Sequence, residues 1–182
     1  MIMSQINRKQ MILQSLVDIL TEEQVGKITT KVIAERTQVT EAALYKHFPS
    51  KTAIFEELFN FMDVSFTDKF TEIKIKHKDS LNRSRAMFQF LILFVEKNPG
   101  FARILNREAL TTDEQVIKDS VNTMLANIEK EFYVSLGNER SARLLLVLIE
   151  GVYTRFIRSE FKELPSTYID DLWVAASRTI FA

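Results

Sequence analysis

Residues 29–58 read TTKVIAERTQVTEAALYKHFPSKTAIFEEL. Three hydroxyl-bearing positions divide this stretch: a threonine of the pair 29–30, then Thr40, then Ser50. Each stands where its side-chain oxygen can accept a hydrogen bond from the free N–H groups at the start of a helix. Because the residue before a proline is pushed out of helical geometry, the helix after Thr40 must end before Pro49. The stretch therefore predicts two short helices and the start of a third, separated by tight turns.

An amphipathic helix is expected before this stretch. Its apolar residues follow spacings close to three and four over residues 6–20, and Gly26 marks its end: Ile6, Met11, Leu13, Leu16, Val17 and Leu20. Two short helices joined by a turn of a few residues, inside a three-helix unit, present the second short helix to the major groove of DNA. We therefore expect a helix-turn-helix unit at the N-terminus.

The remaining sequence keeps the helical spacing. It predicts a long helix of nearly thirty residues from Lys51 and further helices over 81–97, 101–110, 114–136 and 139–161, with Thr112 and Asp113 as a cap, and a last helix that follows Pro165 and ends near Ile180. Only 4 Gly and 3 Pro occur in the 182 residues, which leaves little turn chemistry for a sheet. The expected fold is all-α with about nine helices. We divide it into a DNA-binding domain at 1–51 and a helical dimerisation and regulatory domain at 52–182.

Charge has to be read locally, because 24 basic and 24 acidic side chains give a formal net charge of zero. Within the predicted helix-turn-helix unit, Ile33, Val39 and Leu44 can form a small core. The polar or small residues left facing outward are Thr30, Lys31, Ala43, Tyr45, Lys46 and His47. Hydroxyl and lysine side chains are the groups that meet phosphate oxygens, and an alanine methyl can meet a thymine methyl. Pattern alone also allows a merely solvated helical face.

The exact string narrows the choice. Residues 29–58 resemble, without a gap, the helix-turn-helix signature of the TetR family, in which a small residue, Leu, Tyr, a variable residue, His or Tyr, and Phe are followed by a capped Lys. The resemblance implies a homodimer that reads double-stranded DNA at a pseudo-palindromic site, and it implies that six residues face the DNA: Thr30, Lys31, Ala43, Tyr45, His47 and Lys51. Lys51 and the start of the fourth helix would bind a phosphate.

A second resemblance covers nearly the whole chain. The stretches EAALYKHFPSKTAIFEELFNF, EKNPGFARILNREAL and EGVYTRFIRSEFKELP are similar to the nucleoid occlusion factors of this family, which bind chromosomal sites and, when DNA-bound, antagonise assembly of the tubulin-like division protein FtsZ. This resemblance implies an FtsZ-binding surface with Phe61, Phe90, Leu93, Lys97 and Asn98. The chain departs from the group at Phe90 and Leu93. Core packing is an equal alternative for Phe61, and Lys97 also suits a solvated helix C-terminus.

The family resemblance places the dimer interface on the last two helices. The residues expected there are Leu145, Ile149, Tyr153, Phe156 and Trp173. Two subunits joined in this way would carry two recognition helices about one DNA turn apart.

Other classes find little support in the sequence. Cysteine is absent, the two histidines stand in unrelated settings, and neither a glycine-rich phosphate loop nor a paired-histidine metal motif occurs, so we expect no enzyme, cofactor or metal. The N-terminus resembles neither a signal peptide nor a membrane span, and the expected location is the cytoplasm, in association with the nucleoid. The alternative function is that of a ligand-responsive repressor, with a small-molecule cavity among the central helices.

Overall fold

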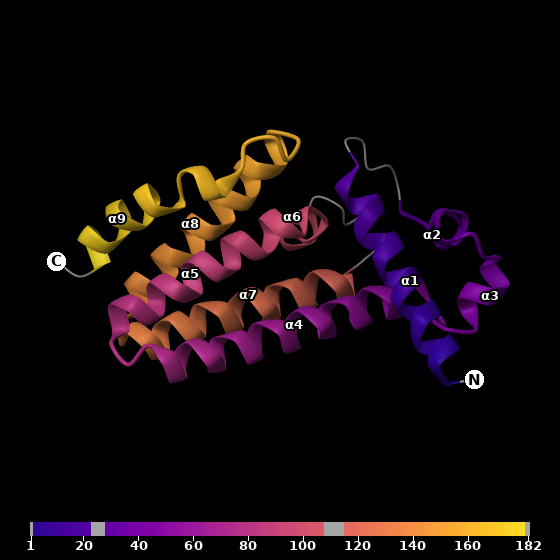
Figure 1. Ribbon diagram of the computed structural model, residues 1–182, viewed down its shortest axis with the longest axis horizontal. Coiled ribbons are helices and arrows are strands. Elements are labelled where there is room, and N and C mark those ends of the chain that lie inside the picture. Colours follow the sequence, from indigo (N-terminus) through magenta and orange to yellow (C-terminus); the bar gives the residue numbers. More distant parts are fainter. Residues whose placement is uncertain (1, 23–27, 108–114, 181–182) are drawn as a thin grey trace.

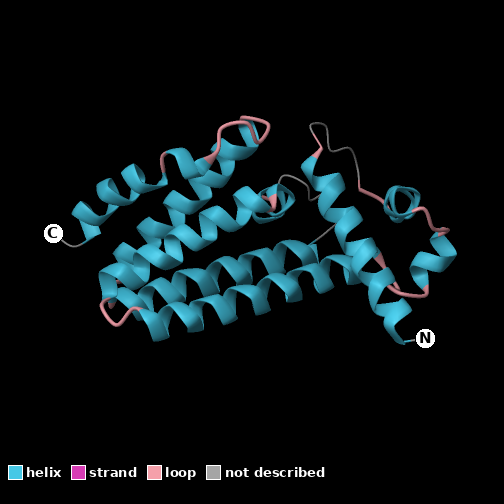
Figure 2. Cartoon of the chain, in the orientation of Figure 1, coloured by secondary structure: helices cyan, strands magenta, loops and turns pink. Residues whose placement is uncertain are grey.

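The computed structural model describes residues 2–22, 28–107 and 115–180. Within these residues the chain forms nine α-helices and one 3₁₀ turn (Figure 2). The elements are α1 Ile2–Thr21, α2 Thr30–Thr37, α3 Glu41–Tyr45, α4 Lys51–Lys76, α5 Ser80–Lys97, α6 Pro99–Leu105, α7 Gln115–Leu136, α8 Glu139–Arg158, η1 Pro165–Thr167 and α9 Ile169–Ile180. Three residues predicted to bound helices lie outside the described residues: Gly26, and the capping pair Thr112 and Asp113.

The predicted hydroxyl caps are confirmed. Thr29, Thr40 and Ser50 each have extended backbone and accept a hydrogen bond from the N–H group three residues further on, at 3.2, 3.1 and 3.1 Å respectively. Such a cap satisfies one of the N–H groups that the first turn of a helix leaves without a partner. The start of each helix in the helix-turn-helix unit is thus set by one local side chain.

Two predicted boundaries differ from the structure. The short helix expected at 101–110 begins at Pro99, since a proline fits the first position of a helix, and it ends at Leu105 because Arg107 has a left-handed φ of 59°. Helix α8 was expected to reach Phe161 but ends at Arg158. Phe161 has a left-handed φ of 62°, which a helix cannot contain.

The helices form two connected parts, which we call the head (α1–α3) and the body (α4–α9). In Figure 1 the head lies at one end, and α4 runs from it along the whole length of the body, beside α7. Helices α8 and α9 lie on the side of α5 away from α4. None of the helices that the structure describes is both long and apolar enough to cross a bilayer.

The core of the body is filled by large apolar side chains of α5, α7 and α8. Phe88, Phe132 and Phe156 are among the largest fully buried side chains. Tyr153 is also buried, and its hydroxyl donates a hydrogen bond to the carbonyl of Leu91 at 3.1 Å. Burial raises the pKa of Tyr153, so its hydroxyl stays a neutral donor.

The five residues predicted at the dimer interface are buried within the single chain. Leu145, Ile149, Tyr153, Phe156 and Trp173 are all at most 3% exposed. A side chain already covered by its own chain offers little surface to a second one, and the place of these residues in a dimer interface stays a prediction. Helical periodicity identified a buried stripe correctly, but it does not say what buries the stripe.

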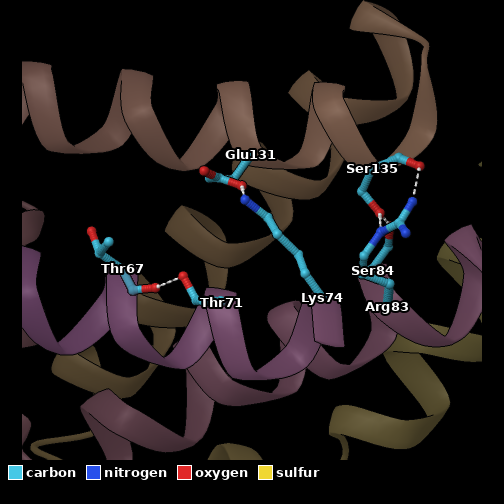
Figure 3. Close-up of polar contacts among 7 residues, drawn as sticks. All are labelled: Thr67, Thr71, Lys74, Arg83, Ser84, Glu131 and Ser135. Carbon is cyan, nitrogen blue, oxygen red and sulfur yellow. Dashed lines mark hydrogen bonds and ion pairs between the residues drawn. The ribbon is translucent and has the colours of Figure 1, made fainter. Parts of the chain in front are cut away.

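Polar contacts fasten the end of the body that lies away from the head (Figure 3). Lys74 of α4 forms an ion pair with Glu131 of α7 at 2.5 Å. Arg83 of α5 donates to the hydroxyl and the carbonyl of Ser135, at 2.9 and 3.0 Å, and the buried hydroxyl of Ser84 lies 2.8 Å from that of Ser135. These contacts fix the C-terminal turns of α7 against both α4 and α5.

The head is attached to the body through α1 and α6, which lie in direct contact. A Cβ atom at Gly100 would come within 2.6 Å of the carbonyl oxygen of Val17, so only glycine fits at this position. Arg103, 4% exposed, donates to the carbonyl oxygen of Leu20 at 2.8 Å and also to that of Glu22. Its guanidinium carbon lies 4.8 Å from the ring centroid of Phe161, beyond α8. One cation thus joins the C-terminal end of α1 to the body.

We expect Arg103→Met to lower the free energy of unfolding by about 2–3 kcal/mol, because methionine fills the space of the side-chain stem but leaves two carbonyl groups without a donor. Urea denaturation followed by circular dichroism measures the change. The control is Arg140→Met at an exposed position of α8, which should change the stability by less than about 0.5 kcal/mol. Equal effects of the two substitutions would contradict the structural role of Arg103.

Candidate nucleic-acid and partner-binding surfaces

The turn between α2 and α3 is formed without glycine. Gln38 ends α2 in the left-handed conformation, with φ 58°, and its N–H group donates to the carbonyl of Glu35 at 3.1 Å. The N–H group of Val39 donates to the carbonyl of Ala34 at 3.0 Å. These two bonds satisfy carbonyl groups at the end of α2 and turn the chain into α3. The sequence did not reveal this role of Gln38, because glycine or asparagine is the usual residue at such a position.

Helix α3 has only five residues and is held by one buried side chain, that of Leu44. Leu44 packs in the small core of the head with Ile33 of α2 and Phe48, which follows α3. The prediction of Ile33 and Leu44 as core residues is confirmed, and Val39 is half-buried against the same core. Since one face of α3 is anchored in this way, its other faces point outward.

The predicted DNA-facing residues occupy three neighbourhoods of the head and the start of α4. Lys31, Tyr45 and Lys46 are exposed, and Thr30, Ala43, His47 and Lys51 are half-buried. Ala43 and His47 line a hollow of about 280 Å³ together with Arg8 and Gln38. Lys31 lies 4.0 Å from Glu35, an exposed pair that contributes little to stability.

Thr30 and Tyr45 belong to a second neighbourhood, which we call the hydroxyl cluster: Thr30, Glu41 and Tyr45. The hydroxyl of Thr30 donates to a carboxylate oxygen of Glu41 at 3.0 Å, and it lies 3.2 Å from the hydroxyl of Tyr45. The cluster joins the first turn of α2 to both ends of α3. Glu41 was not among the predicted site residues, although its place at the first position of the recognition helix was visible in the sequence.

The third neighbourhood is the N-terminus of α4. Ser50 caps the helix, and Lys51 is its first residue, with its ammonium nitrogen 5.6 Å from the ring centroid of Phe55. The N-terminus of a helix carries partial positive charge and free N–H groups, and a lysine there is unfavourable for the helix itself. The two positive contributions make this place suited to a phosphate.

A groove of about 490 Å³ lies between the head and the body. Its lining comes from α1, α4 and the start of α6 and includes Met11, Gln14, Phe61, Asn98 and Phe101; we call it the α1–α4 groove. The ring of Phe61 is 54% exposed, so Phe61 is not a core residue. Exposed apolar side chains beside amide groups suit the binding of a short peptide segment.

The structure brings together only part of the predicted partner surface. Phe61 and Asn98 line the α1–α4 groove, and Lys97 is exposed next to Asn98 at the end of α5. Phe90 and Leu93 are half-buried and do not appear in its lining. Phe90 packs edge-on against Phe66 and Phe70 of α4, with ring centroids 5.6 and 6.0 Å apart. A packing role therefore accounts for much of the Phe90 side chain.

The outer face of α8 has an open apolar stripe, flanked by the exposed charged residues Arg143 and Arg155. It carries Leu144, Val147, Leu148 and Gly151, and Val147 is 57% exposed. A Cβ atom at Gly151 would meet no other atom within 4 Å, so nothing in the single chain requires glycine there. Glycine within a helix costs about 1 kcal/mol relative to alanine, and a close approach of another backbone is a physical reason to accept that cost.

Comparison with known proteins agrees with this architecture. The pattern described as "Bacterial regulatory proteins, tetR family" matches residues 12–58, and an SlmA-like pattern described as "Tetracyclin repressor-like, C-terminal domain" matches residues 78–180. The fold is similar to that of the fatty acid degradation regulator FadR from Bacillus halodurans (TM-score 0.77, 13% identity, 93% of this chain and 94% of that one) and to a TetR-like transcriptional regulator from Rhodococcus sp. RHA1 (TM-score 0.77, 19% identity, 96% of each chain).

The curated relatives are closer in sequence. The nucleoid occlusion factor SlmA of Vibrio cholerae serotype O1 is 38% identical over 96% of both chains, and that of Shewanella sp. strain W3-18-1 is 36% identical over 92% of both. The helix-turn-helix head and the all-α body define a TetR-type regulator, as the resemblance of residues 29–58 predicted. Within that class, the chain belongs to the family of the nucleoid occlusion factor SlmA.

We expect Leu44→Ala to unfold the recognition helix locally, because it removes the only buried side chain of α3 and leaves a cavity that costs about 2–4 kcal/mol. Hydrogen exchange should show lost protection of the amides in residues 30–48, with protection kept in α5 and α8. Lys46→Ala, at an exposed position beside it, is the control and should change little. Exchange that rises evenly over the whole chain would contradict this view of the head.

Proposed function

We propose that the chain is a sequence-specific DNA-binding homodimer that acts as a nucleoid occlusion factor and, while bound to DNA, antagonises the assembly of FtsZ. The observation that carries this proposal is the similarity to SlmA over nearly the whole length of the chain, including the C-terminal half. The α1–α4 groove, which lies between the head and the body, also supports the proposal because it offers a surface to a partner. We assign DNA binding to residues 1–51, and dimerisation and partner binding to residues 52–182. The protein would be associated with the nucleoid.

DNA binding is proposed to use the outward faces of α2 and α3 and the start of α4. The residues assigned to it are Thr30, Lys31, Ala43, Tyr45, Lys46, His47 and Lys51. Helix α3 enters the major groove, while Lys51 and the free N–H groups of α4 hold a phosphate of the backbone. The phosphate contact sets the position of the head on the duplex, and the side chains of α3 select the base sequence.

Dimerisation is proposed to bury the open face of α8. Two copies related by a twofold axis would cross near Gly151, where the absence of a side chain lets the helices approach closely, with Val147 and its apolar neighbours beside the crossing. The exposed Val174 extends this face onto α9. A twofold dimer places two recognition helices on a pseudo-palindromic site.

FtsZ is proposed to bind the α1–α4 groove through Phe61 and Asn98, with Lys97 next to Asn98 and with Phe90 and Leu93 on α5 outside the groove lining. The amide nitrogen of Asn98 donates to the carbonyl of Phe94 at 2.8 Å, which fixes the orientation of its side chain beside the groove. One wall of the groove is α1, which belongs to the head. A shift of the head on binding DNA would therefore move one wall of the partner site, which is a physical route to DNA-dependent action on FtsZ.

Lys51→Ala is expected to weaken binding to a selected duplex by about tenfold at a fixed salt concentration of about 0.1 M, and to reduce the slope of log K against log salt by about one. Both changes follow from the loss of one phosphate contact, and fluorescence anisotropy titrations at several salt concentrations measure them. Lys130→Ala, which removes an exposed cation from α7, is the control and should alter neither quantity. Unchanged affinity of the Lys51→Ala protein would remove α4 from the proposed interface.

Phe61→Ala should leave DNA binding intact and abolish the effect on FtsZ, because it removes the exposed ring of the groove and leaves the head unchanged. FtsZ sedimentation with GTP, carried out with the protein alone, with an unrelated duplex and with a selected duplex, measures the effect. The control is Val64→Ala, which truncates a similarly exposed apolar side chain of α4 that is not part of the groove lining. Indifference of FtsZ to the unaltered protein in all three mixtures would instead favour a ligand-responsive repressor.

A further inference from the structure

The hydroxyl cluster fixes the direction of its own hydrogen bonds. An ionised carboxylate only accepts, and a threonine hydroxyl has a single proton. Because Thr30 donates that proton to Glu41 at 3.0 Å, the contact of 3.2 Å between Thr30 and Tyr45 must be donated by the tyrosine. Both hydroxyl protons of the cluster are then used inside it. The cluster presents only lone pairs to a ligand that approaches from outside.

This arrangement does not complement the phosphate backbone of DNA. Phosphate oxygens accept hydrogen bonds and carry negative charge, so they are repelled by an anionic, acceptor-only cluster. Guanine N7 and O6, adenine N7 and thymine O4 are also acceptors. The groups in the major groove that complement the cluster are the exocyclic amino groups of cytosine and adenine.

The two amino groups differ in what lies beside them. The amino group of adenine adjoins the N7 acceptor, which would face a second carboxylate lone pair, whereas the amino group of cytosine adjoins a C–H group. Glu41 is the first residue of α3, and the N-terminal residues of a recognition helix are those that reach base edges. The position of Glu41 brings it to the base edges, and the chemistry of its carboxylate favours cytosine there.

We propose that Glu41 is a specificity-determining residue that reads a cytosine amino group in each half-site, with Thr30 and Tyr45 holding its carboxylate in place. This proposal rests on the proposed DNA-binding function and adds a residue and a base to it. Glu41 acts by exclusion as well as by attraction, because its charge disfavours a guanine or thymine at that position, whose major-groove edges carry only acceptors. Thr30 and Tyr45 serve in part as positioning residues for Glu41.

The experiment begins with selection of duplexes from a random pool at fixed salt, using the full-length protein and its variants Glu41→Gln, Glu41→Ala and Glu35→Gln. The unaltered protein should select a site with a required cytosine in each half. Glu41→Gln should shift that position towards adenine, because a glutamine amide pairs with adenine N6 and N7, and Glu41→Ala should relax it. Glu35→Gln removes an exposed carboxylate of α2 that pairs with Lys31 rather than with α3, and it should keep the original preference.

A chemical probe then tests the contact directly. In the selected duplex, the required cytosine is replaced by 2-pyrimidinone, which lacks the exocyclic amino group. The unaltered protein should lose about tenfold or more in affinity, whereas the Glu41→Ala protein should lose less than about twofold, since it has no contact left to lose. Thermal melts of both proteins confirm that they are folded.

The outcomes separate the two levels of the proposal. If the unaltered protein selects no duplex at all, the proposed DNA-binding function fails. If it selects a site but the Glu41 variants keep the same preference at every position, or if both proteins lose equal affinity on the 2-pyrimidinone duplex, DNA binding stands and the assignment of Glu41 is overturned.

Discussion

The rest of the structure depends on the contact between Arg103 and the last carbonyl groups of α1. A buried guanidinium is costly unless its donors are satisfied, and here carbonyl groups at the open end of a helix accept two hydrogen bonds from Nη1 while adding their own negative partial charge. Gly100, one turn earlier on α6, allows the two helices to approach closely enough for this bond. The head is therefore docked on the body by a directional contact as well as by apolar packing.

This junction lies between two proposed surfaces, the α1–α4 groove and the open face of α8. One side of the α1–α4 groove is formed by α1 of the head, and the rest of its lining comes from α4 and the start of α6. Arg103 continues the connection to Phe161, at the turn that follows α8 and its open face. The division protein and the second subunit would each touch an element, α1 or α8, that packs directly against α6, and DNA would touch α2, which packs against α1. A change at any of them alters the fit around α6, without the need for a longer chain of contacts.

The sequence allowed much of the fold to be predicted, for local reasons. Helix starts were predictable because each depends on one hydroxyl side chain close to the helix that it caps, as at Thr40 and Ser50. The ends of α6 and α8 were not, since they depend on left-handed residues that are neither glycine nor asparagine, such as Arg107 and Phe161. Long-range contacts such as that of Arg103 cannot be read from the spacing of apolar residues along the chain.

For the candidate sites, too, local features could be predicted and long-range contacts could not. A family string identified outward residues of α3, but these did not include Glu41, whose hydrogen bond with Thr30 of α2 links residues eleven positions apart. The predicted interface residues of α8 lie on its buried face. The hydrophobic stripe marked by Leu145 and Ile149 is the strongest in that helix, and the core of the chain itself uses it. The weaker stripe with Gly151 is the one left open.

Helix α4 spans 26 residues and is therefore about 39 Å long at 1.5 Å per residue. One end carries the proposed phosphate contact, and the other is pinned to α7 by the ion pair of Lys74 with Glu131. A rotation of α4 about this ion pair would therefore move the end near the DNA the most. A tilt of about 5° at the pinned end displaces Lys51 by about 3 Å, which is close to the rise of one base pair in B-form DNA. In a dimer, the separation of the two half-sites would then be governed by the end of the body most distant from the duplex.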